Sequence, residues 1–449
     1  MVANSSRRTL IAASIGNVGE QYDFAVFGFT MPVIASEFFP QGDPVAALLS
    51  TFAIFAVGFL ARPLGGLIFG YLLDKLGRVR VLALTIWVMA AGTGIIGLVP
   101  TYHTIGLAAP FLLVLCRLAQ GAAFGGEFTG STTLVLESAP DGKRARWVGT
   151  GHCFSSLPIA GVAIVLFFFQ LLIGKETYSD WGWRIPFLLG SLIGVIGYFL
   201  RRGLEEPEEY KQALKKADKK APLESFSPAG LKSMLHVAMV MPLQAVAAYF
   251  LIGYMYTYMV KQVGLDVGTA LLANGAGIAV YALLCPFTGY LSDCFGRKFM
   301  MSAGAVWIAL VAYLSLHMVA SGSVVGALTG QVILAIGIGI YAAACTVTSV
   351  EVFPTRYRGT GHAIAYQLTV GVLGGTTPLI CGWLVSVLHT PMAPAWYVTG
   401  FAVLNFLMVQ FVPETKNLTL RTSVDTHDND RELNVFEERA RASGAGDVR

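Results

Sequence analysis

The chain is poor in charged residues. Only 13% of its 449 residues are Asp, Glu, Lys or Arg, against about 25% in soluble domains. Apolar residues make up 55%, and the mean hydropathy is +0.63. These values exclude an ordinary soluble protein and predict a polytopic membrane protein. The net charge of +4 does not indicate nucleic-acid binding, because the basic residues lie in short loops.

Several chemical signatures are also missing. The six cysteines lack the spacing of metal ligands, and most fall in apolar runs, so neither a metal site nor a disulfide framework is expected. The sequence contains no Gly-rich loop ending in Lys-Ser or Lys-Thr, so it does not support the use of ATP. No pattern of nucleophile and base stands out, and we do not expect an enzyme.

Long apolar runs recur along the whole chain, and most exceed the roughly 18–20 residues needed to cross a bilayer. We expect twelve spans, near residues 12–38, 46–73, 80–99, 105–138, 147–173, 184–201, 236–260, 268–292, 299–319, 324–351, 359–388 and 395–412. The sequence therefore predicts an all-α membrane protein with two six-helix halves.

Lysine and arginine are distributed unequally between the two sides of these spans. One side would carry 26 of the 31 basic residues, and the loops of the other side only Lys175, Arg184 and Lys261. Arg62 and Arg117 lie within spans. Because basic loops stay in the cytoplasm, both termini are expected to be cytoplasmic.

The polar stretches divide the chain into four parts. We expect a first bundle at 1–201, a cytoplasmic linker at 202–235, a second bundle at 236–414 and a polar, disordered tail at 415–449. The first apolar run continues well past the length of a signal peptide, so no cleavable signal is expected.

Two short patterns recur in the loops on the basic side. Residues 70–78 (GYLLDKLGR) return 219 positions later as 289–297 (GYLSDCFGR), and Glu137 with Arg144 returns as Glu351 with Arg356. An acidic side chain there can contact the N-terminus of a neighbouring helix or the loop arginines, although solvated charges that only set the topology are the alternative. We predict a conformational latch formed by Gly70, Asp74, Gly77, Arg78, Gly289, Asp293, Gly296, Arg297, Glu137, Arg144, Glu351 and Arg356.

Further motifs resemble the metabolite:proton symporter branch of the major facilitator superfamily. They are residues 16–28 (GNVGEQYDFAVFG), 62–66 (RPLGG), 117–121 (RLAQG), 125–127 (GGE), 180–187 (DWGWRIPF) and 353–359 (FPTRYRG). The resemblance implies the major facilitator fold, with a substrate site between two halves that rock around it. It also implies proton-driven uptake across a bacterial inner membrane, and we expect the carrier to act as a monomer.

Carboxylates inside the first half are the candidates for proton coupling. An acidic side chain at the centre of a span costs about 2.5–3.5 kcal/mol, which makes a functional role the default interpretation. Glu20 and Asp23 lie three residues apart and share a helix face. We assign proton coupling to Asp23, Glu20 and Glu127, with a fixed ion pair as the alternative.

Two cations within spans are the candidates for substrate binding. Arg62 and Arg117 are permanently charged and can bind a carboxylate through two parallel hydrogen bonds, or be neutralised by Asp23 and Glu127. Gln120 follows Arg117 by almost one helical turn and joins this set. The second half has no charge deep in a span, and among its polar residues we select Tyr254 and Gln367.

The function predicted from these features is proton-coupled import of a small organic anion, most simply a di- or tricarboxylate such as citrate or 2-oxoglutarate. Gln21 is similar to the citrate-type members, where most of the branch has Trp. Uptake of the zwitterions proline or betaine is the alternative, and their ammonium group would require aromatic faces. A nutrient sensor that does not transport is a more distant alternative. No cofactor is expected beyond the coupling proton.

Overall fold

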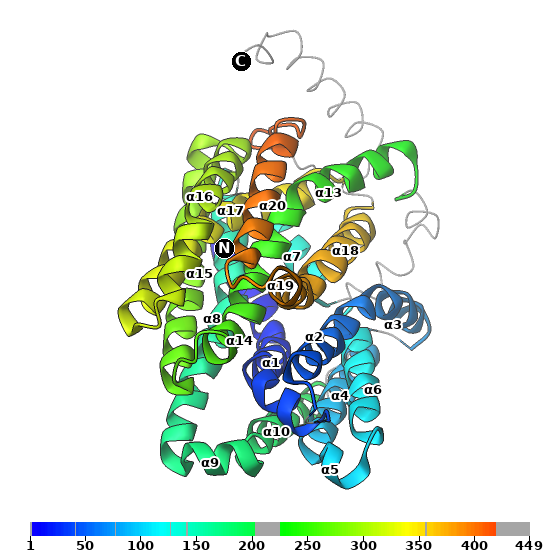
Figure 1. Ribbon diagram of the computed structural model, residues 1–449. Helices are drawn as coiled ribbons and strands as arrows, with labels where there is room; N and C mark the ends of the chain where they lie inside the picture. Colours follow the sequence, from blue (N-terminus) through cyan, green and yellow to red (C-terminus); the bar gives the residue numbers. More distant parts are fainter. Residues whose placement is uncertain are drawn as a thin grey trace.

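The computed structural model describes residues 2–40, 42–76, 78–125, 127–140, 142–202, 225–354 and 357–418 (Figure 1). The first half contains α1 (Val2–Glu37), α2 (Pro44–Leu60), α3 (Arg62–Leu76), α4 (Arg78–Leu98), α5 (Tyr102–Ile105), α6 (Ala108–Phe124), α7 (Glu127–Glu137), α8 (Arg144–Ile173), α9 (Lys175–Thr177), the π-helical turn η1 (Tyr178–Gly182) and α10 (Arg184–Arg202).

The second half is likewise built from helices and π-helical turns. It contains α13 (Pro228–Tyr249), the π-helical turn η2 (Phe250–Tyr254), α14 (Met255–Lys261), α15 (Val267–Phe295), α16 (Arg297–Ala320), α17 (Val324–Glu351), α18 (Arg358–Thr369), the π-helical turn η3 (Val370–Gly374), α19 (Gly375–Leu388) and α20 (Ala393–Val409).

The helices agree with the twelve expected spans. Within the described residues, seven helices are long and apolar enough to cross a membrane, and four shorter apolar helices occupy further expected spans. Helix α1 occupies the remaining one. The prediction of an all-α membrane fold is confirmed, and four single expected spans each consist of two helices joined by a break or a π-helical turn: α2–α3, α6–α7, α13–η2–α14 and α18–η3–α19.

Two boundaries differ from the sequence prediction. Helix α13 begins at Pro228, inside the range expected to be linker, because the Ser227 hydroxyl caps it by accepting from the Gly230 N–H at 3.2 Å. At the other end, Thr415 is fully buried, so the first residues of the expected tail pack against the bundle. The remainder of that tail, 419–449, lies outside the described residues.

Two pairs of helices make the most extensive contacts between the two halves. Helix α8 of the first half packs along α15 of the second, and α2 packs against α19. Figure 1 shows α2, α3, α4 and α6 grouped on one side of the molecule and α15, α16 and α17 on the other. We call the end that carries Glu137, Arg144 and Glu351 the latch end. The end that carries residues 39, 40, 42–44 and 262–266 is the far end.

Candidate functional site

A chain of hydrogen bonds joins three helices inside the first half. The Arg117 guanidinium on α6 donates to Gln120 Oε1 at 3.0 Å, and Gln120 Nε2 donates to the Thr93 hydroxyl on α4 at 2.7 Å. That hydroxyl donates to Asp23 Oδ2 on α1, also at 2.7 Å. All four side chains are buried. Asp23 and Arg117 are therefore connected through two neutral side chains.

A direct ion pair between these two charges is not formed. Among the described residues, no carboxylate oxygen lies within 4.0 Å of the Arg117 guanidinium. Direct neutralisation of Arg117 by Asp23 is one possibility from the sequence, but Gln120 and Thr93 lie between the two charges. Thr93 carried no signal in the sequence, because an isolated threonine in an apolar run is an ordinary helix residue.

Glycines bring the two arginine-bearing helices unusually close. A methyl group added at Gly121 would overlap the backbone of Gly58, and one added at Gly125 would overlap the carbonyl oxygen of Arg62. Small residues allow helix backbones to touch in this way inside a membrane. The helix also breaks at Ala61, immediately before Arg62. Arg62 and Arg117 consequently face the same buried region.

Both guanidinium groups lie on aromatic rings. The Arg62 Cζ is 3.8 Å from the centroid of the Phe59 ring and 3.8 Å from that of Phe124, so the cation is held between two rings. The Arg117 Cζ is 3.7 Å from the centroid of Phe27. Such contacts stabilise a desolvated cation by about 2 kcal/mol. The site therefore contains aromatic faces that already accommodate positive charge.

Little free space surrounds these charges. A cavity of about 30 Å³ is lined by Asp23, Arg62, Arg117 and Gln120, which is room for about one water molecule. A second cavity of about 70 Å³ lies between the two halves, with Arg62 on its first-half side and Tyr249 on its second-half side. Neither leaves room for an organic solute in this conformation.

The cavity between the halves also contains a polar cluster. His152 Nε2 on α8 hydrogen-bonds to the Tyr281 hydroxyl on α15, which also accepts from Gln244 Nε2 on α13 at 3.1 Å. His152 Nδ1 and Gln244 Oε1 are buried and have no hydrogen-bond partner in the described part of the chain. These three residues were not predicted from the sequence as site residues, because each alone is typical of helix packing.

Tyr254 and Gln367 have different surroundings from each other. Tyr254 lines a third cavity of about 610 Å³ at the far end, away from the two arginines. Gln367 Nε2 donates across the halves to the carbonyl oxygen of Gly125 at 3.1 Å. Gln367 does not line any of the three cavities described here. Its contact is with the backbone of the opposite half, and its role in substrate binding stays a prediction.

Two ion pairs cross between the halves at the latch end. Arg144 lies 3.3 Å from Glu351, and Arg358 lies 2.9 Å from Glu137. The sequence pattern groups each glutamate with an arginine of its own half, whereas Glu137 contacts Arg358 and Glu351 contacts Arg144 across the halves. The sequence held the signal, since Arg358 follows Arg144 by the same 214 positions that separate Glu351 from Glu137.

Asp293 joins the two halves through a helix N-terminus. Its carboxylate accepts from the backbone N–H groups of Ala145 at 3.0 Å and Arg146 at 2.9 Å, in the first turn of α8. Arg297 lies 3.0 Å from Asp293 and 3.2 Å from Glu351. These contacts place negative charge at the positive end of a helix, where it is stabilised.

Two latch glycines have a steric role. A methyl group at Gly289 would overlap the Ala145 carbonyl oxygen of the opposite half. Gly296 has a φ of 103°, which strains other residues, and it packs against the Glu414 carboxylate. The latch end is thus closed by direct contact of the two halves.

Some predicted site residues lie outside what the structure describes. The side chains of Glu20 and Glu127, for proton coupling, fall in this group. So do the latch residues Gly70, Asp74, Gly77, Arg78 and Arg356.

Comparisons with known proteins give consistent results. The family model described as Major Facilitator Superfamily matches residues 13–279 and 241–439. A proline/betaine transporter of Salmonella typhimurium is 34% identical over 92% of this chain and 85% of its own length. The glycine betaine/proline/ectoine/pipecolic acid transporter of Dickeya dadantii gives the same values, and a putative proline/betaine transporter of Staphylococcus aureus is 33% identical over 97% of this chain and 94% of its own.

Solved structures are similar in fold. The xylose transporter of E. coli in a partially occluded inward open conformation has a TM-score of 0.71 at 20% identity, covering 92% of this chain and 99% of its own. A D-xylose–proton symporter has a TM-score of 0.73 at 22% identity, with the same coverage.

Proposed function

Because this chain belongs to the major facilitator superfamily and is a secondary transporter of that type, we propose that it imports a small zwitterion of the proline or betaine class together with protons. The bound species is inferred from the relatives, whose names specify proline, betaine and related zwitterions. The di- or tricarboxylate favoured by the sequence analysis has no such support. We therefore propose as substrate the zwitterion that the sequence offered as the alternative.

One observation carries the proposal, namely the position of the Arg62 guanidinium between the Phe59 and Phe124 rings. A betaine carries a carboxylate and a quaternary ammonium a few bonds apart. The carboxylate can pair with a guanidinium, and the ammonium can occupy ring faces of the kind that Arg62 now covers. A substrate with both charges can thus exchange partners with Arg62, whereas a tricarboxylate would leave the rings without a cation.

Further rings extend this surface toward the second half. The Phe24 ring lies 5.2 Å from Phe55 and 5.6 Å from Tyr249, and Phe59 lies 5.0 Å from Tyr249 between centroids. They form a layer contributed by both halves. Rings from both sides can close around an ammonium group as the halves approach one another, which makes occlusion depend on the substrate.

Proton coupling is proposed to act through the hydrogen-bonded chain from Asp23 to Arg117. When Asp23 is ionised, the Thr93 hydroxyl donates to it and accepts from Gln120. The same hydroxyl lies 2.9 Å from the Met89 carbonyl oxygen, an alternative acceptor. A proton on Asp23 allows the carboxyl to donate to Thr93, which then turns to Met89.

Protonation of Asp23 also removes a negative charge from the cavity that Arg62 and Arg117 line. Arg117 and Arg62 then attract a substrate carboxylate more strongly, because the interaction is screened little inside the protein. Proton and substrate therefore favour each other's binding, which is the reciprocal coupling that symport requires. The closed latch end, taken as cytoplasmic from the distribution of basic residues, corresponds to a state that faces outward.

Uptake into proteoliposomes tests the proposal. With the lumen more alkaline than the outside, radiolabelled glycine betaine or proline should accumulate, and a protonophore should abolish the accumulation. Unlabelled betaine should compete strongly and citrate weakly. Uptake that a protonophore leaves unchanged rejects proton coupling, and preferential uptake of citrate rejects the zwitterion.

A further inference from the structure

We propose that the cavity of about 610 Å³ at the far end is a separate binding site for the carboxylate group of a small solute, with Lys261 as its cation. The inference rests on the proposed function only in taking this solute to be the transported zwitterion. The site would capture substrate before it reaches the arginines. We name this cavity the far-end site.

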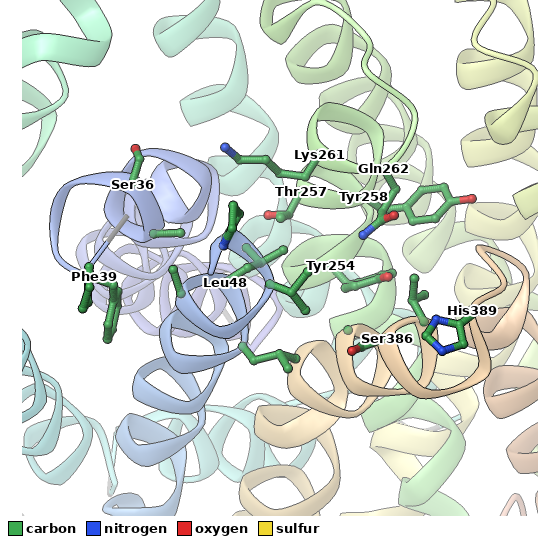
Figure 2. Close-up of a pocket in the computed structure, with 18 residues that line it drawn as sticks. Ser36, Phe39, Leu48, Tyr254, Thr257, Tyr258, Lys261, Gln262, Ser386 and His389 are labelled. Carbon is green, nitrogen blue, oxygen red and sulfur yellow. The ribbon is translucent and has the colours of Figure 1, made fainter. Parts of the chain in front are cut away.

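Four helices from both halves form the walls of this cavity. Residues at the end of α1, the start of α2, the end of α14 and the end of α19 line it, among them Ser36, Leu48, Lys261 and Ser386 (Figure 2). Ser36 and Lys261 are exposed, so solvent reaches the cavity. Its volume is ample for a proline or betaine molecule.

The charge of the cavity is of one sign. Lys261 is the lysine among its lining residues, and the lining contains no aspartate or glutamate. Within the described residues, no carboxylate oxygen lies within 4.0 Å of the Lys261 ammonium. A nearby acid, Asp266, is paired with Lys175 of the first half instead. Among the residues that the structure describes, no acidic side chain therefore competes with a ligand for the Lys261 ammonium.

A second observation points to a ligand. Thr257 lines the cavity one helical turn before Lys261, and its side chain is 1% exposed. Its hydroxyl has no hydrogen-bond partner in the part of the chain that the structure describes. A buried donor without a partner costs about 1–3 kcal/mol, so such groups are usually occupied by water or ligand. A carboxylate that binds Lys261 could accept a hydrogen bond from Thr257 as well.

Aromatic rings in the same cavity supply the other half of a zwitterion site. Tyr254 and Phe39 line it, and both can face an ammonium or methyl group. Tyr254 also packs against Phe52, with ring centroids 5.9 Å apart. Phe55 follows Phe52 by about one turn along α2, toward Arg62, and belongs to the layer of Phe24, Phe55 and Tyr249. The far-end site is consequently separated from the arginines by rings that must move for a solute to pass.

Cysteine labelling tests the far-end site without any transport. Ser386→Cys is introduced with Cys294→Ser, because Cys294 is the exposed one of the six native cysteines. An anionic methanethiosulfonate reagent should label this cysteine faster than a cationic one. Adding Lys261→Gln should reduce that preference roughly three- to tenfold, as expected for one unit charge at close range in water, and Lys261→Arg should preserve it.

Protection and transport complete the test. Millimolar glycine betaine should slow the labelling in the Lys261 protein and fail to do so after Lys261→Gln. The same substitution should raise the KM for uptake several-fold with kcat unchanged. A labelling rate that does not depend on the charge of the reagent, or that does not change when Lys261 is replaced, contradicts the proposal of a far-end site. If the charge preference is present and betaine neither protects nor is transported, the site stands as a carboxylate site and the proposed function fails.

Discussion

Arg358 of the second half lies 2.9 Å from Glu137 of the first, and the equivalent pair, Arg144 with Glu351, runs in the opposite direction between the halves. The two contacts are related by the internal repeat of the chain. Each half therefore contributes one acid and one base to the closed latch end. Separation of the halves breaks both ion pairs at once. The two pairs therefore stabilise the closed state together.

Removing one acid of this arrangement should weaken the closed latch end. In Glu137→Gln, the nearly buried Arg358 loses its carboxylate partner, and we expect the closed state to lose about 1–3 kcal/mol. A cysteine placed at the latch end should then react faster with thiol reagents. Exchanging the charges, with Glu137→Arg and Arg358→Glu together, should restore slow labelling. No change in labelling after Glu137→Gln would show that the pair does not hold the halves together.

Gly289→Ala should act on the conformation by steric overlap. The added methyl group collides with the Ala145 carbonyl oxygen of the other half. The conformation in which the latch end is closed can then no longer form, and transport falls severely. Gly400→Ala in α20 is the matched control, since a methyl group there meets nothing within 4 Å. Thermal unfolding should show that both variants are folded. Equal uptake by the two variants would contradict the steric argument.

Asp23→Asn should separate substrate exchange from proton coupling. The amide keeps a donor and an acceptor near Thr93 and cannot lose a proton, so accumulation driven by a pH gradient should stop. Exchange of labelled for unlabelled betaine across the membrane should persist, because it needs no net proton movement. Gradient-driven accumulation by the variant would show that Asp23 does not carry the coupled proton.

Phe124→Leu should distinguish the zwitterion from a carboxylate substrate. Loss of one ring beside Arg62 removes a cation–π contact of about 0.5–2 kcal/mol, equivalent to a two- to thirtyfold weaker apparent affinity for glycine betaine. Phe168→Leu on an exposed face of α8 is the control and should have no effect. Competition binding with betaine and citrate measures both. Betaine affinity equal in the two variants would contradict the role of the rings.

The ion pair between Lys175 and Asp266 should make a small, pH-dependent contribution at the far end. The hydrogen bond from Lys175 lowers the pKa of the Asp266 carboxyl below its ordinary value. The stabilisation is therefore present above the ordinary pKa of aspartate and is lost as the pH falls through the lowered pKa. Both side chains are largely exposed, so Lys175→Gln should cost no more than about 1 kcal/mol.

Thermal unfolding in detergent at two pH values checks this contribution. The variant should unfold at a slightly lower temperature than the parent at neutral pH, and at the same temperature once Asp266 is protonated. At neutral pH, Lys175→Arg should unfold at a higher temperature than Lys175→Gln, as the parent protein does. A deficit in Lys175→Gln that persists unchanged in acid would mean that the lysine acts through packing instead.

Parts of the site could be found from the sequence because intramembrane charge is so rare. Asp23, Arg62 and Arg117 stand out as charged residues in apolar runs. Thr93 and His152 could not be found in this way, since an isolated hydroxyl or imidazole is common in helices. Their importance comes from neighbours contributed by other helices, Gln120 for Thr93 and Tyr281 for His152. Tyr254 belongs to a π-helical turn, which periodicity does not reveal.

The amino-acid sequence alone determined the twelve spans, the repeated halves and the presence of buried charge, because hydropathy, loop charge and internal repetition are properties of local segments. Only the tertiary structure decided which charges meet. Arg144 contacts Glu351, and Asp23 reaches Arg117 through Thr93, because packing brings together helices far apart in the chain. Partner choice inside a membrane depends on which helix faces approach closely, and glycines such as Gly121 and Gly289 set that approach.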